Sequence, residues 1–197
     1  MTLRLAAGLG VLVLLAGCAV ERGVALPPMD DWSARQAVLG GIRDWSFSGR
    51  IGVSTGEEGF NGKLRWNQRQ ERYDATVSGP FGAGSVRIDG DGRRVRLMDP
   101  DGVVTDLVDA EQELRAMYGW TIPVASLRYW ALGIPDPALP AATELGDDGL
   151  LVRLEQNSWV VEIGQYRDAA GQAMPRSISA TGADTRVRLV IDSWTFR

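Results

Sequence analysis

Apolar and polar residues alternate in a series of short runs, and this alternation restricts the fold more than any other feature of the sequence. Phe60, Leu64 and Trp66 fall on one side of one such run, and polar or charged residues fall on the other side. A period of two is typical of a β-strand that buries one face and exposes the other. Turn sequences join the runs: GEEG, QRQE, GPFG, DGDG and DPDG. We therefore predict an antiparallel meander, with strands at 47–55, 60–68, 72–78, 84–89, 93–98 and 102–107.

The middle of the chain has the spacing of helices instead of strands. Residues 109–118, DAEQELRAMY, have an acidic first turn and are followed by a glycine, which favours a helix with defined ends. Residues 123–133, PVASLRYWALG, begin with a proline and end with a glycine, which also favours a helix. A further helix is predicted at 30–44, where Asp30 or Asp31 can act as the N-cap.

Strands, two helices and strands again follow one another along the chain. The proline-rich stretch 134–142, IPDPALPAA, is expected to be an irregular joint after the second of these helices. In a chain of 197 residues, this order indicates one α+β domain whose curved antiparallel sheet is partly wrapped over helices. The strands expected after the joint are 150–156, 158–166, 175–181 and 186–196.

The N-terminus predicts a secretory signal. Arg4 is followed by an apolar run that is too short for a membrane span and ends in small residues. The run closes with LAGC, which resembles a bacterial lipobox. Residues 1–17 are therefore predicted to be a lipoprotein signal peptide, and Cys18 the acylated first residue of the mature chain. The alternative is a plain secretory signal with a chance cysteine. Several lipid chains on Cys18 would anchor the protein durably.

The residue after Cys18 bears on the destination. In Gram-negative lipoprotein sorting, Asp at this place favours retention in the inner membrane, so by resemblance Ala19 indicates the outer membrane. Residues 18–29, with small residues and a proline pair, are predicted to be a tether that spans at most about 40 Å. Residues 30–197 are then predicted to form a single periplasmic domain.

The composition gives little support to catalysis. The sequence has no histidine, which is the commonest general base, and its single cysteine excludes an internal disulfide. No nucleotide-binding, zinc-binding or nucleophile-elbow motif occurs. Lys63, a conceivable partner in a Ser–Lys dyad, falls on the polar face of a predicted strand. The formal net charge of −4 argues against nucleic-acid binding. We therefore expect a protein that is not an enzyme and uses no metal or cofactor.

Seven tryptophans give the chain a large aromatic surface. Either they fill the core, which is the favoured interpretation for Trp45, Trp120 and Trp194, or some of them line an apolar cavity between sheet and helices. The loop SGPFGAG at 78–84 places a further aromatic residue, Phe81, at the tip of a turn, where small polar residues are usual. Phe81 either folds back onto the sheet or contacts something outside the protein.

Several stretches together resemble the family of the outer-membrane lipoprotein receptor and insertion factor LolB. They occur in the family's order and cover most of the chain after the signal. The combination of lipobox, SGPFG loop and PVASLRYWALG helix is the most specific part of the resemblance. The stretches are WSFSGRIGV (45–53), KLRWNQ (63–68), YDATVSGPFGAG (73–84), GWTIPVASLRYWALGIP (119–135), QNSWVVEIGQY (156–166), MPRSIS (174–179) and RLVIDSWTF (188–196).

The resemblance implies an unclosed antiparallel β-barrel, or half-barrel, with short helices covering a hydrophobic cavity. Trp66 of KLRW, Trp130 of LRYW and Trp159 of QNSW match the tryptophans that line the family's cavity for acyl chains. Phe81 takes the place of the protruding apolar residue, usually leucine, on the family's membrane-insertion loop. That loop consists here of Gly79, Pro80, Phe81 and Gly82.

The same resemblance implies the function. A member of this family receives acylated lipoproteins from a soluble periplasmic carrier, LolA, and inserts them into the inner leaflet of the outer membrane. The member itself is lipid-anchored to the periplasmic face of that membrane. The expected partners are this carrier, acylated lipoproteins and outer-membrane lipid, and we expect a monomer. Two alternatives are a lipid-anchored carrier of other hydrophobic ligands on the same fold, and a structural lipoprotein with a filled core.

Overall fold

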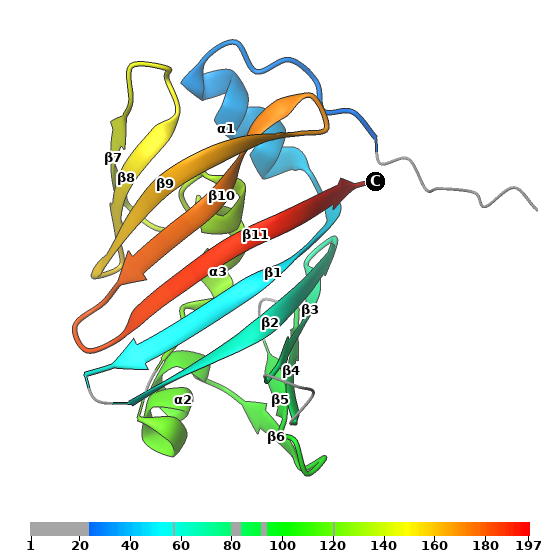
Figure 1. The fold of residues 1–197 in the computed structure, drawn as a ribbon, viewed down its shortest axis with the longest axis vertical. Coiled ribbons are helices and arrows are strands. Elements are labelled where there is room, and N and C mark those ends of the chain that lie inside the picture. The colour runs from blue at the N-terminus through cyan, green and yellow to red at the C-terminus, as the bar shows by residue number, and fades with distance from the viewer. Residues whose placement is uncertain (1–23, 57, 80–83, 92–93, 120) are drawn as a thin grey trace, which may run out of the picture.

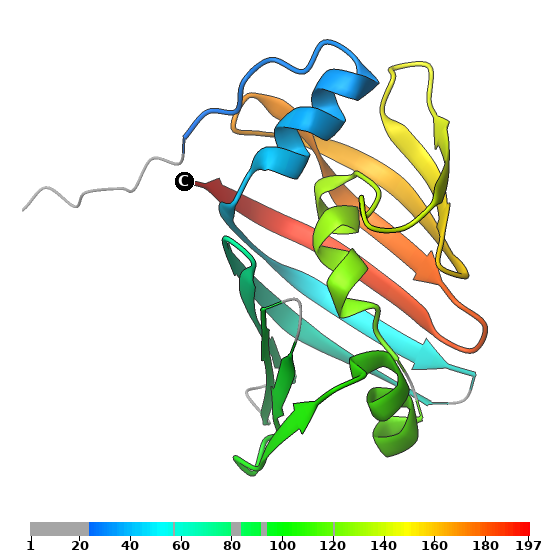
Figure 2. The same ribbon diagram turned by 180° about the vertical axis from the view of Figure 1, so that it is seen from behind.

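The computed structural model describes residues 24–56, 58–79, 84–91, 94–119 and 121–197. In these ranges the chain forms one antiparallel sheet of eleven strands, with three helices on one side of it (Figures 1 and 2). The strand order is β6-β5-β4-β3-β2-β1-β11-β10-β9-β8-β7, so β6 and β7 are the two edges and the sheet is not closed. The strands are β1 (Asp44–Thr55), β2 (Glu58–Arg69), β3 (Arg72–Ser78), β4 (Ser85–Gly90), β5 (Val95–Met98), β6 (Val104–Leu107), β7 (Ala141–Leu145), β8 (Leu151–Gln156), β9 (Trp159–Ala169), β10 (Gln172–Thr181) and β11 (Arg186–Phe196).

The connection between the two halves of the sheet runs across its concave face. The chain builds β1 to β6 outward to one edge and then crosses this face through α2 (Ala110–Tyr118) and α3 (Val124–Leu132) (Figure 2). It re-enters the sheet at the opposite edge as β7 and returns strand by strand to β11, which pairs with β1. α1 (Trp32–Gly41) lies on the same face as α3. This path accounts for the order of strands, helices and strands in the sequence.

Aspartates cap two of the helices, and Asp31 is one of the two caps predicted for the first of them. The side chain of Asp31 accepts a hydrogen bond from the backbone N–H of Ala34 at 2.7 Å, which caps α1. At α2, Asp109 accepts from the N–H of Gln112 at 3.0 Å, and Glu113 accepts from the N–H of Asp109 at 3.0 Å. The three predicted helices are therefore confirmed, although α1 is shorter than predicted because the chain enters β1 soon after it. No helix in the described ranges is long and apolar enough to cross a membrane.

The core lies between the concave face of the sheet and the helices, and aromatic side chains form much of it. Trp45, Phe47 and Trp66 stack with their rings nearly parallel and their centroids between 6.1 and 6.3 Å apart. Trp194 is half-buried, and its ring centroid lies 5.7 Å from that of Trp45. The core position predicted for Trp45 is thus confirmed, Trp194 packs at the margin of the core, and Trp120 lies outside the described residues.

β7 is a strand that the sequence pattern does not predict. All five of its residues are exposed, so the run AATEL has no alternation between a buried and an exposed face. The strand forms at the edge of the sheet through backbone pairing with β8 alone. The expectation of an irregular joint over 134–142 is therefore wrong at its last two residues, because pairing with a neighbour produces this strand without a buried face.

Candidate functional site

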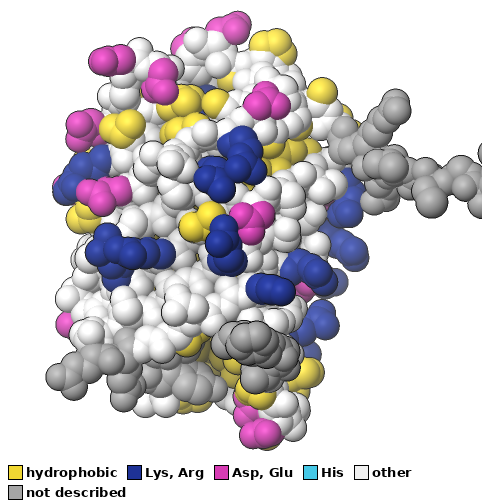
Figure 3. Space-filling view, viewed as in Figure 1, with side chains coloured by type: hydrophobic (Ala, Val, Ile, Leu, Met, Phe, Trp, Pro, Cys, Tyr) yellow, Lys and Arg dark blue, Asp and Glu magenta, His cyan; other side chains and the backbone are white. Residues whose placement is uncertain are grey.

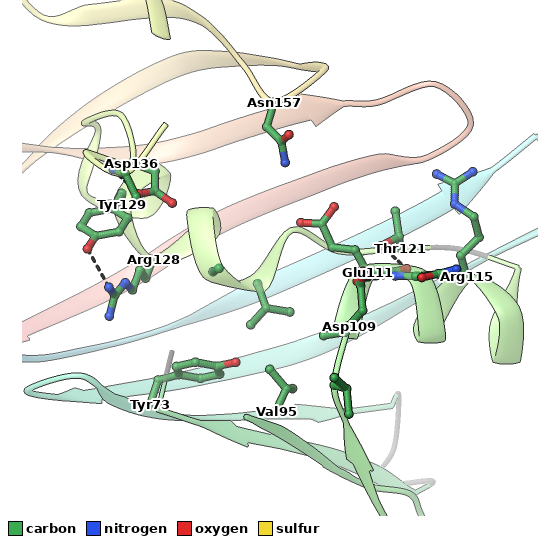
Figure 4. A pocket seen from close by; sticks show the side chains of 16 residues that line it. Tyr73, Val95, Asp109, Glu111, Arg115, Thr121, Arg128, Tyr129, Asp136 and Asn157 are labelled. Carbon is green, nitrogen blue, oxygen red and sulfur yellow. Dashed lines mark hydrogen bonds between the residues drawn. The ribbon is translucent and has the colours of Figure 1, made fainter. Parts of the chain in front are cut away.

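A pocket of about 770 Å³ opens on the concave side of the sheet. It lies between the two helices that cross this side, α2 and α3, and the strands β3 and β5 (Figure 4). Because the helices cross over the sheet, residues far apart in the sequence meet here. The apolar and aromatic lining residues are Tyr73, Val95, Val108, Ala110, Val124, Ala125, Tyr129 and Ala138.

Charged side chains share the same pocket. Asp109, Glu111 and Arg115 come from the N-cap and body of α2, and Arg128 and Asp136 come from α3 and the segment after it (Figure 4). Burial raises the pKa of the Glu111 carboxyl, the neighbouring Asp109 raises it further, and Arg115 lowers it. The lining is therefore mixed in polarity, with apolar wall residues beside charged ones.

Arg128 ties α3 to the turn between β2 and β3. Its two terminal guanidinium nitrogens each donate to Oε2 of Glu71 at 3.3 Å, and one of them also donates to the hydroxyl of Tyr129 at 2.6 Å. The guanidinium carbon lies 4.6 Å from the centroid of the Tyr129 ring. Arg43 forms a second ion pair with Glu71. These contacts fix the position of Arg128 and Tyr129, both of which line the pocket.

Tyr73 connects the pocket with the aromatic core. Its ring lines the pocket and also stacks on Trp66, with the centroids 4.9 Å apart and the planes 14° apart. Burial raises the pKa of Tyr73 to about 12. Trp66 is itself only 2% exposed, and its Nε1–H donates to Oε1 of Gln68 at 3.2 Å. Trp66 therefore lies directly behind a residue of the pocket wall.

Trp130 of α3 and Trp159 of β9 form a second aromatic pair, with their ring centroids 6.2 Å apart. Trp130 is fully buried, and its Nε1–H donates to Oε1 of Gln156 at 3.0 Å. Trp159 lines a smaller pocket of about 190 Å³. Glu111 and Arg115 line both pockets, so the two lie next to each other.

The three predicted cavity tryptophans are thus buried in two aromatic groups. Among the residues that the structure describes, Trp66, Trp130 and Trp159 are not part of the lining of the 770 Å³ pocket. Their role in binding acyl chains stays a prediction.

The predicted insertion loop is described only at its base. The backbone N–H of Gly79 donates to the carbonyl of Gly84 at 3.2 Å, which closes the base between β3 and β4. The other predicted site residues, Cys18, Pro80, Phe81 and Gly82, lie outside the described residues.

Sequence reasoning missed three residues of this region: Tyr73, Arg128 and Gln156. Tyr73 and Arg128 reach the pocket only because α3 crosses the face of the sheet that carries β3, and no local pattern reports that crossing. A signal for Gln156 was available, because it lies two residues after Leu154 and so falls on the inward face of its strand. A polar residue on an inward face indicates a structured hydrogen-bond network.

Comparison with known proteins decides the family. Residues 43–194 match the family model described as "LolB: Outer membrane lipoprotein LolB". The chain belongs to the LolB family. The outer-membrane lipoprotein LolB of Nitrosococcus oceani is 38% identical over 186 residues, which cover 93% of this chain and 92% of the relative. LolB of Halorhodospira halophila is 37% identical over 198 residues, which cover 98% of this chain and 95% of the relative.

Solved structures with little sequence similarity share the fold. A LolA superfamily protein from Nitrosomonas europaea matches with a TM-score of 0.55 at 8% identity, over 80% of this chain and 87% of that one. A DUF1329 family protein from Desulfovibrio piger matches with a TM-score of 0.54 at 5% identity, over 83% of this chain and 90% of that one. These likenesses confirm the open antiparallel sheet as the architecture.

Membership of the LolB family confirms the function and location that the resemblance implies. The chain is an outer-membrane lipoprotein that receives lipoproteins and inserts them into the outer membrane. LolB is a lipoprotein localisation factor, and a role of this kind is consistent with the expectation of a protein that is not an enzyme.

Proposed function

We propose that the pocket between α2, α3 and β3 is where this LolB protein takes up the acyl chains of a lipoprotein delivered by a soluble LolA-type carrier. The observation that carries the proposal is the position of the pocket on the concave face, beneath the two helices that cross it. Its volume of about 770 Å³ is in the range of roughly 300–1,000 Å³ that is typical of pockets for small ligands.

The rim of the pocket supports an apolar ligand. Val108 lines the pocket and is 95% exposed. Removing a valine side chain from water lowers the free energy, so this exposed position favours contact with an apolar ligand. Ala125 is also exposed and lines the same pocket. An acyl chain that lies along these two side chains would cover apolar surface that water now contacts.

The aromatic groups behind the pocket offer room for deeper burial. Tyr73 separates the pocket from Trp66, and the smaller pocket beside the larger one reaches Trp159. We infer that acyl chains displace Tyr73 and α2 and reach a hydrophobic cavity formed by Trp66, Trp130 and Trp159. An exposed ion pair between Arg115 and Asp184 and a hydrogen bond from Thr121 Oγ1 to the carbonyl of Glu111 hold this region. The exposed ion pair contributes only about 0–1 kcal/mol, but Leu114 of α2 is fully buried, so contacts with the acyl chains must replace the packing that such a movement breaks.

Insertion is assigned to the loop Gly79–Gly82 and anchoring to Cys18. Burial of the Phe81 side chain in lipid would contribute roughly 1.5–3 kcal/mol, which biases contact with a membrane without holding the protein there. The lipid chains on Cys18 would hold it. Because the sequence has no nucleotide-binding motif, direction must come from a higher affinity for the acyl chains at each successive site.

Site-specific photo-crosslinking tests the pocket. A photoreactive amino acid replaces Ala125 in the pocket or, as the control, Ala142, which is exposed on the edge strand β7. After delivery of an acylated lipoprotein from the carrier, we expect crosslinks at position 125 and none at position 142. The same lipoprotein without its acyl chains should give none at either position. Equal crosslinking at both positions, or crosslinking at 125 that does not depend on the acyl chains, would contradict the proposal.

A further inference from the structure

One row of outward-facing residues crosses the sheet from its β6 edge. Strand pairing places Val104 beside Met98, Met98 beside Arg87, Arg87 beside Thr76, and Thr76 beside Arg65. The helices cover the opposite, concave face of the sheet, so this row lies on the convex face. The row is apolar at the edge of the sheet and becomes basic toward its centre.

The basic part of this face extends over β1 and β2. Arg50 lies beside Lys63 in the next row, and Lys63 lies beside Ser78 of β3. Together, Arg50, Lys63, Arg65 and Arg87 form what we call the basic patch. Figure 3 shows Lys and Arg side chains across the middle of this face, from its left margin to its right margin. A basic patch on a chain with a formal net charge of −4 is a local departure from the charge of the whole.

Two of the four cations in the basic patch have no carboxylate partner among the described residues. Arg50 pairs with Asp192 at 3.1 Å and Arg87 pairs with Asp89 at 3.8 Å. Lys63 and Arg65 form no ion pair in the described part of the chain, and both are exposed. With Arg50 they line a hollow of about 380 Å³, to which Ser48, Thr76 and Ser78 contribute hydroxyl groups and Asp192, the partner of Arg50, contributes a carboxylate. Such a hollow has the donors that bind a phosphate group.

The apolar part of the row lies on an exposed hairpin, whose turn also carries the acidic residues Asp99 and Asp101. Met98 is 38% exposed, Val104 is 48% exposed, and Val103 in the turn before β6 is 59% exposed. Exposed large apolar side chains that gather at one edge of a protein mark a contact surface. The turn of this hairpin approaches the base of the insertion loop, because a Cβ added to Gly84 would lie 3.0 Å from the Cβ of Pro100.

We propose that the apolar hairpin β5–β6 and the basic patch together form a membrane-docking surface that binds the headgroups of anionic phospholipids. Met98, Val103 and Val104 enter the boundary between headgroups and acyl chains, and Lys63 and Arg65 bind phosphate oxygens. An apolar edge followed by a basic rim is the combination that interfacial proteins use on anionic membranes. This inference rests on the proposed function for its purpose, since docking would orient the protein beside the bilayer into which it releases its cargo.

A membrane fits this surface better than an acidic protein does. Exposed valines and a methionine beside the cations match a surface that is apolar a few ångströms below its charged groups. The basic patch begins next to the base of the proposed insertion loop, since Lys63 pairs with Ser78 and Gly79 closes the loop base. A docking surface continuous with this loop would bring both to the same bilayer.

The test uses the full-length acylated protein anchored in vesicles. Acylation occupies the thiol of Cys18, so a single introduced cysteine can carry an environment-sensitive fluorophore. Asp101→Cys places it at the turn of the β5–β6 hairpin, and the matched control Asp147→Cys places it in the β7–β8 turn at the opposite edge of the sheet. In vesicles that contain phosphatidylglycerol, we expect blue-shifted emission from position 101 and emission typical of water from position 147. In vesicles of phosphatidylcholine alone, position 101 should remain largely in water.

Charge reversal tests the basic patch directly. Lys63→Glu with Arg65→Glu should lower the docking equilibrium in phosphatidylglycerol vesicles by at least about 25-fold, since each basic residue near an anionic surface contributes roughly fivefold. The control, Arg167→Glu with Arg186→Glu on β9 and β11, changes the net charge equally and should have a much smaller effect. High salt should weaken docking of the unmodified patch.

Other outcomes would overturn the inference. Equal emission from position 101 in the two kinds of vesicle, or equal effects of the two charge-reversed pairs, would show that the basic patch does not bind anionic lipid specifically. If Lys63→Glu with Arg65→Glu spares docking but weakens binding of the carrier, the patch serves an acidic protein instead. If docking fails but acyl-dependent crosslinking at position 125 persists, the docking surface is rejected and the pocket is not. If docking occurs but this crosslinking is lost, the pocket is rejected and the docking surface is not.

Discussion

The indole Nε1–H of Trp130 donates to Oε1 of Gln156 at 3.0 Å, and both side chains are buried. The same Oε1 accepts from the N–H of Asp136 at 2.9 Å. Nε2 of Gln156 donates to the carbonyls of Asp136 and Leu139, at 2.9 and 3.1 Å. The side-chain amide of Gln156 on β8 therefore forms hydrogen bonds both to α3 and to the segment that follows α3. These bonds fix the position of Trp130, one of the predicted cavity residues.

Replacement of Gln156 by leucine should destabilise the protein by about 3 kcal/mol, because it leaves buried donors and acceptors without partners. Urea unfolding would measure the loss. Gln165→Leu, at an exposed position on β9, is the matched control and should change the free energy of unfolding by less than about 0.5 kcal/mol. A similar small change for both variants would show that the Gln156 network does not hold α3.

Truncation of Trp66 tests whether this side chain packs or faces a void. Trp66 is 2% exposed and stacks on Tyr73, Trp45 and Phe47, so Trp66→Ala should lower the free energy of unfolding by about 3–5 kcal/mol. Trp66→Phe keeps a ring in the stack and should lose less than half as much. A loss below about 1 kcal/mol for Trp66→Ala would contradict the packing described for Trp66.

Tyr73 should make stability depend on pH in the alkaline range. Burial raises the pKa of Tyr73 to about 12, so the folded state holds this proton more tightly than the unfolded state does. Its contribution to stability is complete below about pH 10, the ordinary pKa of tyrosine, and is lost as pH rises toward 12. Tyr73→Phe should therefore flatten part of the fall in unfolding free energy between pH 10 and 12.

Tyr166 provides a comparison for this pH dependence. Burial raises the pKa of its phenol as well, and the hydroxyl donates to the carbonyl of Leu151 at 2.8 Å. The double variant Tyr73→Phe with Tyr166→Phe should therefore be flatter than either single variant. If Tyr73→Phe alone leaves the alkaline loss of stability unchanged, Tyr73 is not buried from water as described.

Val108 should contribute to the capture of acyl chains. It lines the pocket and is almost fully exposed, so Val108→Asp places a charge where an apolar chain is proposed to lie. Loss of the apolar contact corresponds to about tenfold weaker binding of a fluorescent fatty-acid probe. Leu145→Asp, at an exposed apolar residue of β7, is the control and should leave the affinity unchanged. Equal weakening by both would point to a general effect of charge.

Local patterns in the sequence predict much of the sheet and all three helices, because alternation and capping act over a few residues. Asp31 and Asp109 cap helices where aspartates precede helical spacing, and Trp45 is buried where the alternation places it. β7 escapes prediction because its residues are exposed on both faces and the strand depends on a neighbour far along the chain.

The site was harder to predict, because its geometry depends on long-range packing. Tyr73 and Arg128 line one pocket only through the crossing of α3 over the sheet. The resemblance named Trp66, Trp130 and Trp159, but the motifs KLRW, LRYW and QNSW give no information about whether the space beside them is empty. In the described structure these rings pack on other side chains, and the indole N–H groups of Trp66 and Trp130 donate to glutamines, so an acyl cavity at this place requires movement.

The most direct test of the central claim is lipoprotein transfer from a loaded LolA-type carrier to vesicles by the anchored protein. Wild type, Phe81→Leu and Phe81→Glu would be compared, with acceptance from the carrier and insertion into lipid measured separately. We predict that all three accept the lipoprotein, that wild type and Phe81→Leu insert it, and that Phe81→Glu retains it. If none of the three takes the lipoprotein from the carrier, or if Phe81→Glu inserts it as well as wild type does, the account of uptake in the pocket and insertion by the loop is contradicted.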